Sequence, residues 1–467
     1  MKESKASSKQ LFILTGSVIA LTCVSFLTCG SLSFAQDCSN RPTSPANLEP
    51  LAFKSTDGGA SWNTMVDVNT DFLAHQLGKI VVDPLKPSNI YLGTNNGVFK
   101  SANGGCSWRD SSDGITERYV RDLIIDPKTT SNLYALAAKS SGNIYRVPVN
   151  NKVFITVDGG NVWKAVSFDY NIDCLAIDSA NPSTVYLGAS NQDILGIYKS
   201  TDIGKTFTFI KQRDNTSGLS IRYIVVDPKN PSTVYYGSNM PGDSNTLGGL
   251  YKSTDGGITF EIIRHPDDYT VTFALVIDPR DPSTLYEASS RGLFKSMDGG
   301  SNWMGILYKG YPLVAESLAI DTGDTIYASV DLPVGSLYPL HNLLKSTDAG
   351  QTWTSVTFKA SASYLAFDPA NPSVIYDVGF VPPPLIGSVS ISGKKVVVGA
   401  YFIHDGAVIK IDGERQKTQL RTGANGFPSG ELVSRKGAKG IAPGQVVSVS
   451  VEEADGVEVS GFGYCPN

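Results

Sequence analysis

Short apolar runs bounded by polar turns recur along the chain from residue 51 to residue 380. Ile224-Val225-Val226 and Leu275-Val276-Ile277 are two of them, and each is followed directly by an aspartate. Runs that are rich in β-branched residues and bounded by turn residues are typical of β-strands. The pattern therefore predicts an all-β domain.

One repeated motif reads Ser/Thr-x-Asp-x-Gly-x-x-aromatic, usually after an apolar or aromatic residue and a lysine. Its seven copies begin at Ser55, Ser101, Thr156, Ser200, Ser253, Ser296 and Ser346. Its acidic positions are Asp57, Asp158, Asp202, Asp255, Asp298 and Asp348, with Asn103 substituting once. Its aromatic positions, which include all five tryptophans of the chain, are Trp62, Trp108, Trp163, Phe207, Phe260, Trp303 and Trp353. The hydroxyl and carboxylate can bond backbone groups of a hairpin, and glycine can adopt its turn conformation, so we expect these residues to be structural.

A second motif alternates with the first and consists of apolar-x-apolar-Asp, a turn that often contains proline, and an apolar residue before tyrosine. Its aspartates are Asp83, Asp126, Asp178, Asp227, Asp278, Asp321 and Asp368. Its tyrosines are Tyr91, Tyr134, Tyr186, Tyr235, Tyr286, Tyr327 and Tyr376. Because aspartate accepts from nearby backbone N–H groups and proline fixes φ, the segment between them is expected to be a turn.

The spacing of the first motif, 46, 55, 44, 53, 43 and 50 residues, suits a four-stranded blade. Such a blade cannot bury both faces alone, so blades stack into a ring. The region begins with half a blade near Leu51 and ends with the other half between Leu365 and Gly379. The sequence therefore predicts a seven-bladed β-propeller over residues 51–380, closed by a blade that both halves complete.

Residues 51–380 resemble Asp-box, or BNR-repeat, propellers, which include sialidases, xyloglucanase-type glycoside hydrolases, sortilin-like receptors and photosystem II assembly factors. The Asp-Pro-x-x-Pro-Ser turns look closest to the assembly factors and to the xyloglucanase propellers. In these families the boxes lie on the outer rim and are structural. One carboxylate per turn is far from the six to eight oxygens that Ca²⁺ takes, so no metal and no cofactor is expected.

The resemblance raises two enzyme classes. Tyr145-Arg146-Val147-Pro148 resembles a sialidase motif but follows two boxes instead of preceding them, and sialidases have six blades. Xyloglucanase-type enzymes pair two propellers around a cleft and use two aspartates, whereas one propeller is predicted here. The segment Ser200–Gly204 is similar to the surroundings of one such aspartate, but it is also an ordinary box. No catalytic residue is therefore assigned.

Propellers usually bind ligands around the central channel, and the residues just before each first strand should ring its mouth. The predicted binding set is Lys79, Arg121, Asp122, Asp173, Arg222, Tyr223, Glu316 and Tyr364. Arg121 and Arg222 would meet an anionic group, and the tyrosines would offer stacking surfaces. The alternative is that the charged members pair with one another. The long loops Asn239–Gly248 and Val330–Asn342 are expected to overhang this face.

A stiff spacer, Val381-Pro382-Pro383-Pro384, opens a predicted linker over 381–387. Strands are then expected at Val389–Ile391, Lys395–Val398, Ala407–Ile411, Val446–Val451 and Val457–Phe462. The segments Gly393–Gly399, Gly406–Gly413 and Ala442–Gln445 resemble IPT/TIG modules. The resemblance implies an immunoglobulin-like β-sandwich over 388–467, a type of module that serves as a spacer or adhesive unit.

The N-terminus has the pattern of a secretory leader. Lys2, Lys5 and Lys9 precede the uncharged stretch Leu11–Ala35, which ends in the small-x-small pattern that signal peptidase cleaves. We expect a signal peptide over 1–35 and a linker over 36–50, with an uncleaved membrane anchor as the alternative. No membrane span is expected after cleavage. Four cysteines would remain, of which Cys38 and Cys465 could join the two ends.

Composition adds one exclusion: with a formal net charge of −5, the chain offers no basic face for nucleic acid. The sequence thus favours an exported protein (secreted, periplasmic or at the cell surface) with a protein or polysaccharide ligand. We expect non-catalytic binding or scaffolding. The alternative is a glycoside hydrolase of the xyloglucanase type acting on a plant-type or extracellular polysaccharide.

Overall fold

The computed structural model describes residues 50–65, 77–139, 151–191, 194–214, 220–239, 248–264, 271–332, 340–356 and 361–380 of the repeat region. Toward the C-terminus it describes 385–392, 395–401, 408–411, 414–416, 418–422, 429–434, 446–452 and 458–464. Every regular element in these ranges is a β-strand. None of the described segments is a helix long and apolar enough to span a membrane.

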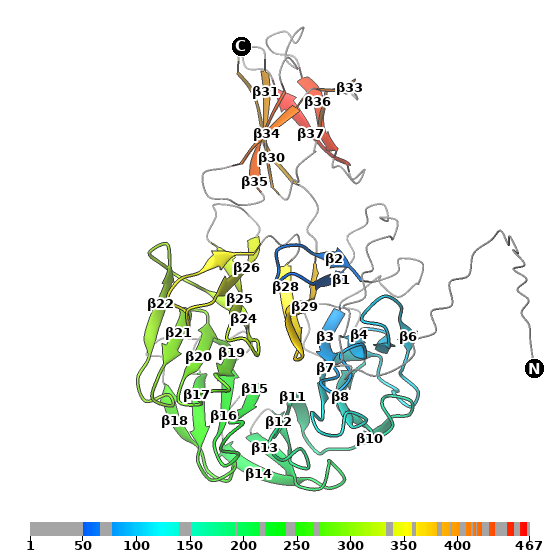
Figure 1. Ribbon diagram of the computed structural model, residues 1–467, viewed down its shortest axis with the longest axis vertical. Coiled ribbons are helices and arrows are strands. Elements are labelled where there is room, and N and C mark those ends of the chain that lie inside the picture. The colour runs from blue at the N-terminus through cyan, green and yellow to red at the C-terminus, as the bar shows by residue number, and fades with distance from the viewer. Residues whose placement is uncertain are drawn as a thin grey trace, which may run out of the picture. The chain divides into compact units, whose positions relative to one another are not determined.

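Residues 50–380 form seven antiparallel sheets arranged as blades of a ring (Figure 1). We number the blades in chain order. Blade 1 contains β3 (Leu77–Val82), β4 (Ile90–Thr94), β5 (Gly97–Ser101) and β6 (Arg109–Asp110). Blade 2 contains β7 (Tyr119–Ile125), β8 (Leu133–Ala138), β9 (Lys152–Thr156) and β10 (Lys164–Val166). Blade 3 contains β11 (Asn171–Ile177), β12 (Val185–Ser190), β13 (Ile194–Ser200) and β14 (Thr208–Asp214). Blade 4 contains β15 (Ser220–Val226), β16 (Val234–Asn239), β17 (Gly249–Ser253) and β18 (Glu261–Arg264).

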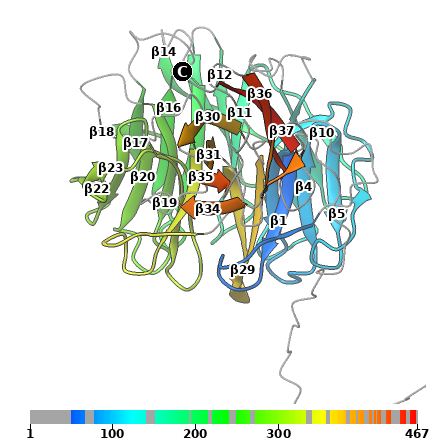
Figure 2. The same ribbon diagram turned by 90° about the horizontal axis from the view of Figure 1, so that it is seen from above.

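Blade 5 has a fifth strand and contains β19 (Thr272–Ile277), β20 (Leu285–Ser289), β21 (Gly292–Ser296), β22 (Met304–Tyr308) and β23 (Tyr311–Pro312). Blade 6 contains β24 (Ala315–Ile320), β25 (Ile326–Leu332), β26 (Leu340–Ser346) and β27 (Thr354–Ser355). Blade 7 joins β28 (Ser361–Asp368) and β29 (Asn371–Phe380) to β1 (Pro50–Ser55) and β2 (Asn63–Thr64). In each blade the strands run roughly along the ring axis (Figure 2).

Strand β1 pairs with β29 from Pro50↔Phe380 to Ser55↔Ile375, so the two ends of the repeat region share one sheet. The prediction of a closed seven-bladed propeller is confirmed.

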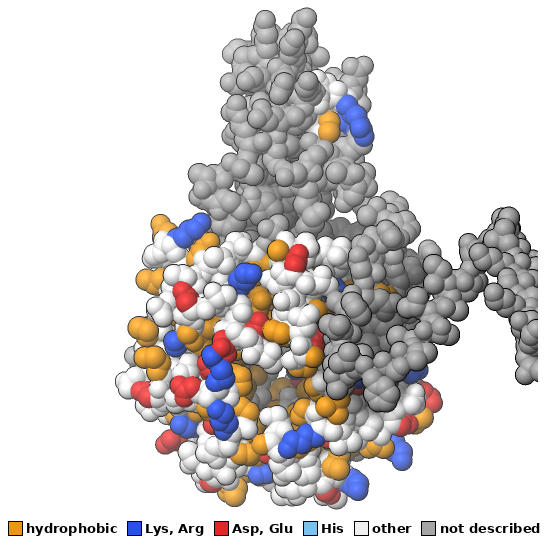
Figure 3. All heavy atoms as spheres, viewed as in Figure 1, with side chains coloured by type: hydrophobic (Ala, Val, Ile, Leu, Met, Phe, Trp, Pro, Cys, Tyr) orange, Lys and Arg blue, Asp and Glu red, His pale blue; other side chains and the backbone are white. Residues whose placement is uncertain are grey.

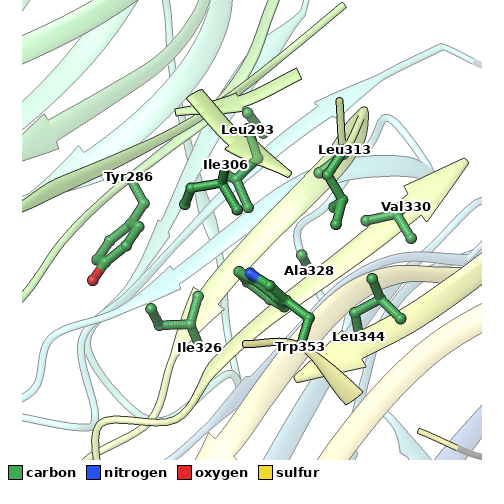
Figure 4. Close-up of a cluster of buried hydrophobic side chains, with 11 residues drawn as sticks. Tyr286, Leu293, Ile306, Leu313, Ile326, Ala328, Val330, Leu344 and Trp353 are labelled. Atoms are coloured by element: carbon green, nitrogen blue, oxygen red, sulfur yellow. The ribbon is translucent and has the colours of Figure 1, made fainter. Parts of the chain in front are cut away.

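An apolar cluster lies at each interface between neighbouring blades. Between blades 5 and 6, Tyr286 and Ile306 meet Ile326 and the box tryptophan Trp353 (Figure 4). All seven tyrosines of the second motif are at most 2% exposed, so each blade contributes one large aromatic side chain to the packing between blades.

The first motif forms a hydrogen-bonded hairpin. In blade 7, Ser55 Oγ accepts the backbone N–H of Gly59 at 2.8 Å and donates to Asp57 Oδ1 at 2.8 Å. Asp57 also accepts the backbone N–H of Ser61, and Trp62 Nε1 donates to the carbonyl of Gly59. The backbone of Gly59 has φ +89°, a left-handed conformation that glycine adopts at little cost.

A lysine precedes six of the seven boxes and joins neighbouring blades. Its Nζ atom donates to a carbonyl in the box turn of the next blade, at 2.6 to 3.1 Å. The six pairs are Lys54 with Gly104, Lys100 with Gly159, Lys199 with Gly256, Lys252 with Gly299, Lys295 with Ala349, and Lys345 with Gly58. At four of these junctions the tyrosine of the second motif donates to the same carbonyl. We call this arrangement the lysine clamp.

The C-terminal strands form two antiparallel sheets. One contains β30 (Leu385–Ser392), β31 (Lys395–Tyr401), β34 (Thr418–Thr422) and β35 (Ser429–Ser434). The other contains β32 (Val408–Ile411), β33 (Glu414–Arg415), β36 (Val446–Glu452) and β37 (Glu458–Tyr464). Strand β30 begins inside the segment predicted as a linker. The immunoglobulin-like assignment stays a prediction.

Candidate functional site at the channel mouth

The innermost strand of every blade contains a β-bulge near its start, where two residues interrupt the register with the second strand. The first bulge residues are Gly78, Arg121, Asp173, Arg222, Phe273, Glu316 and Ser363. The second bulge residues are Lys79, Asp122, Cys174, Tyr223, Ala274, Ser317 and Tyr364. A bulge re-aims side chains and often lies beside a functional site. All eight residues of the predicted binding set belong to these two groups, so the fold brings them to one level of the ring.

The propeller face is hollowed at its centre, and apolar and basic side chains border the hollow (Figure 3). The bulges lie near the starts of the innermost strands, on the side of the ring opposite the box turns. Side chains from four consecutive blades interact there, and they come from blades 7, 1, 2 and 3.

Lys79 and Asp122 form an ion pair between blades 1 and 2, with Nζ 2.9 Å from Oδ1. Asp122 also accepts the backbone N–H of Leu123 at 2.9 Å and, from blade 3, that of Leu175 at 3.2 Å. Enclosure alone would lower the pKa of Lys79, but the charge of Asp122 and its hydrogen bond outweigh this effect and raise the pKa. This pair agrees with the alternative that channel charges pair with one another.

Asp173 connects blades 3 and 4. Its Oδ2 accepts the backbone N–H of Ile221 at 3.1 Å, and its Oδ1 accepts from Asn171 Nδ2 at 3.0 Å. Burial raises the pKa of Asp173 to about 6, against the opposing effects of the Ser190 hydroxyl, the Ile221 N–H and the charge of Arg121. Asp173 can therefore carry a proton in mildly acidic water.

Arg121 is half-buried, and its Nη1 atom is enclosed without a hydrogen-bond acceptor in the described part of the chain. Its charge acts on Asp173 and on the phenol of Tyr364. Tyr364 is 40% exposed and is acted on by the charges of Asp122 and Lys79 as well. These groups form one polar cluster.

The remaining members of the set lie in different surroundings. Arg222 and Glu316 are exposed. Tyr223 lies against the backbone of Gly237, where an added Cβ would be 2.3 Å from the ring. That glycine is therefore required for the position of the ring.

Sequence reasoning missed two supporting residues, Asn171 and Ser190, which orient Asp173. Their position at strand ends beside the bulge residue Asp173 is the signal that could have found them. Cys174, the next bulge residue, is a buried free thiol. Cys106 is disulfide-bonded. Cys38 and Cys465 lie outside the described residues, and the suggested pair between them stays a prediction.

The sialidase-like segment Tyr145–Pro148 falls outside the described residues. So do most of the long loops Asn239–Gly248 and Val330–Asn342. Among the described residues, no group of three or more His, Cys, Asp or Glu side chains could hold a metal ion.

Comparisons with known proteins find similarity to two xyloglucanases. No family model matches the chain. A xyloglucanase of Hypocrea jecorina (strain QM6a) is 27% identical over 280 residues, covering 56% of this chain and 28% of that protein. A xyloglucanase of Paenibacillus sp is 26% identical over 316 residues, covering 56% of this chain and 30% of that protein. The chain thus spans less than a third of the length of these relatives.

The solved GH74 enzyme of Niastella koreensis has the same fold, with a TM-score of 0.52 and 18% identity over 89% of this chain and 74% of that one. The non-catalytic function favoured by the sequence finds no support in the two xyloglucanase relatives, which favour the hydrolase alternative.

Proposed function

We propose that this chain is a glycoside hydrolase of the xyloglucanase type that acts on a plant-type or extracellular polysaccharide at the channel mouth. The observation that carries the proposal is its similarity to two xyloglucanases over 56% of its length. The polar cluster at the channel mouth belongs to the propeller.

Hydrolysis of a glycosidic bond needs one carboxyl group that donates a proton and a second that activates water or attacks the sugar. Asp173 is our candidate for the proton donor, because burial keeps its pKa near 6, where the acid form persists in mildly acidic water. The Asn171 amide and the Ile221 N–H fix the position of its carboxyl group.

Glu316 is our candidate for the second carboxyl. It is the first bulge residue of blade 6, and Asp173 is the first bulge residue of blade 3. These blades are three steps apart, the largest separation in a ring of seven, so the two residues come from opposite sides of the channel. An inverting mechanism requires two carboxyl groups about 6.5–9.5 Å apart on opposite faces of the sugar.

The test uses the purified full chain with xyloglucan, xylan and a soluble cellulose derivative, following released reducing ends and pull-down together. We expect cleavage of xyloglucan that Asp173→Asn and Glu316→Gln each reduce by about 100-fold or more. Glu261→Gln, on the exposed outer strand β18, is the matched control and should stay within about twofold of the unaltered chain.

Three outcomes separate the possibilities. Retention on one glycan without released ends would overturn the hydrolase and leave a binding protein. Cleavage that both variants retain would overturn only the residue assignment. If the protein neither binds nor cleaves any of the glycans, the proposal that its ligand is a polysaccharide is overturned.

We further propose that the protein is exported through the leader at residues 1–35. The disulfide at Cys106 supports this proposal, since disulfides persist in oxidising compartments. N-terminal sequencing of the mature protein should find Gln36 as the first residue, and an intact N-terminus would count against cleavage.

A further inference from the structure

Arg121 has hydrogen-bonding capacity that its protein surroundings do not use. A guanidinium carries five N–H donors, and the Nη1 of Arg121 is enclosed without an acceptor among the described residues. A buried donor without an acceptor is unfavourable, because it has lost its hydrogen bonds to water. An acceptor supplied from the channel would remove this cost.

The neighbouring carboxyl oxygens are already engaged. Both oxygens of Asp122 are held by Lys79 and by backbone N–H groups, and those of Asp173 by Ile221 and Asn171. The charge of Arg121 acts on Asp173, but its Nη1 atom donates no hydrogen bond to that carboxyl group. The cluster therefore contains a cation that no carboxylate saturates.

We infer that Arg121 binds an anionic substituent of the polysaccharide, either the carboxylate of a uronic acid or a sulfate ester, while Tyr364 lies against the sugar ring. The planar guanidinium fork matches the two oxygens that either group presents. Tyr364 is exposed enough to meet a sugar and lies within electrostatic reach of Arg121. The inference rests on the proposed function only in taking a glycan as the ligand.

Arg121 is better placed for this role than Arg222. Both occupy the first position of a bulge, but Arg222 is exposed, where water and salt screen its charge. Arg121 lies in a more enclosed wall, where an ionic hydrogen bond is stronger.

The test is calorimetric titration of the full chain with three tetrasaccharides: cellotetraose, cellotetraose with one residue oxidised to a uronate, and cellotetraose with one sulfate ester. We expect one or both anionic forms to bind at least tenfold more tightly than the neutral one at low salt. The form that gains affinity identifies the group, carboxylate or sulfate. Equal affinity for all three would overturn the inference.

Arg121→Gln should reduce the preference to within about twofold, and Arg121→Lys should retain part of it. The control is Arg109→Gln, which removes the same charge from an exposed position on the outermost strand β6 and should retain the preference. A preference that persists in Arg121→Gln would overturn the assignment. Should that variant not fold, phenylglyoxal labelling of the unaltered chain gives a second measurement. The anionic tetrasaccharide should protect Arg121 from modification, and unprotected labelling would count against the site.

Failure of this inference is distinguishable from failure of the proposed function. Cleavage of neutral xyloglucan without a preference for anionic glycans would support the proposed hydrolase and overturn the anion site. A preference for anionic glycans without cleavage would support the anion site and overturn the proposed hydrolase.

Discussion

Lys345 donates a hydrogen bond of 3.0 Å from its Nζ atom to the backbone carbonyl of Gly58, which lies 287 positions earlier in the chain. The bond joins blade 6 to blade 7 and repeats a contact found at five other junctions. Ring closure therefore uses the same side-chain chemistry as the stacking of successive blades.

Replacing Lys345 by methionine should lower the free energy of unfolding by about 1–3 kcal/mol, because the carbonyl of Gly58 loses a charged donor. Guanidinium unfolding measures this change. Lys205→Met is the control, since Lys205 is exposed in the box loop of blade 3. Equal effects of the two substitutions would show that the clamp does not contribute to stability.

The junction of blades 2 and 3 lacks the lysine clamp, because Ile155 stands at the lysine position and Ile203 at the turn position. There the Tyr134 hydroxyl has no hydrogen-bond partner among the described residues, whereas the Tyr186 hydroxyl donates to Gly256 at 3.1 Å. Tyr186→Phe should therefore cost about 1 kcal/mol, while Tyr134→Phe should be neutral or slightly stabilising. Unfolding curves of the two variants test this difference, and an equal loss would contradict it.

The box carboxylates should make the propeller sensitive to acid. Hydrogen bonds, first from the side chains of Thr206, Asn302 and Thr352, lower the pKa of Asp202, Asp298 and Asp348 to about 2 from an ordinary 3.8. The folded state holds fewer protons than the unfolded state between these values, so stability should fall as the pH drops from about 4 to about 2. Melting temperatures across this range should fall less steeply when all three residues are replaced by asparagine, as blade 1 has naturally at Asn103. Parallel curves for the two proteins would refute the argument.

Asp173 should have the opposite effect. Burial raises its pKa to about 6, so the folded state holds more protons than the unfolded state between about pH 4 and 6. Its contribution to stability should therefore decline as the pH rises through this window. Asp173→Asn should flatten that part of the stability profile. A variant with an unchanged slope would show that Asp173 does not titrate in this range.

The thiol of Cys174 should resist modification in the native protein. It is buried, and burial raises its pKa well above the ordinary value, so little thiolate forms near neutral pH. Peptide mapping after iodoacetamide treatment at about pH 8 should find Cys174 unlabelled in the folded protein and labelled after unfolding. Fast labelling of the folded protein would place this thiol in contact with solvent.

The ring was predictable because one motif fixes the hairpin of every blade and the half-blades at its two ends must pair. The bulges were harder to foresee, although two successive polar residues inside an apolar run, as in Arg121-Asp122, are their signal. The lysine of the clamp is visible in the sequence, but its acceptor is a backbone carbonyl of another blade, which no residue type marks.

The residues at the channel mouth were predicted as a group, but the sequence did not show which of them are enclosed and which are exposed. Sequence treats Arg121 and Arg222 alike, whereas the structure encloses a guanidinium nitrogen of one and exposes the other. In the C-terminal region, strands lie at all five predicted places, but β33, β34 and β35 were missed because their surroundings are polar and rich in glycine.

The pairing of β1 with β29 also sets an order for folding. Strands β1 and β2 leave the ribosome first, yet their sheet is incomplete until residues as far as Phe380 have followed. Until then β1 presents an unpaired edge that could pair with another chain. Completing the ring also requires closing a loop of about 320 residues, a slow step that local contacts cannot replace. A chaperone that covers β1 during synthesis and export would therefore raise the yield of folded protein more than one acting on any later blade.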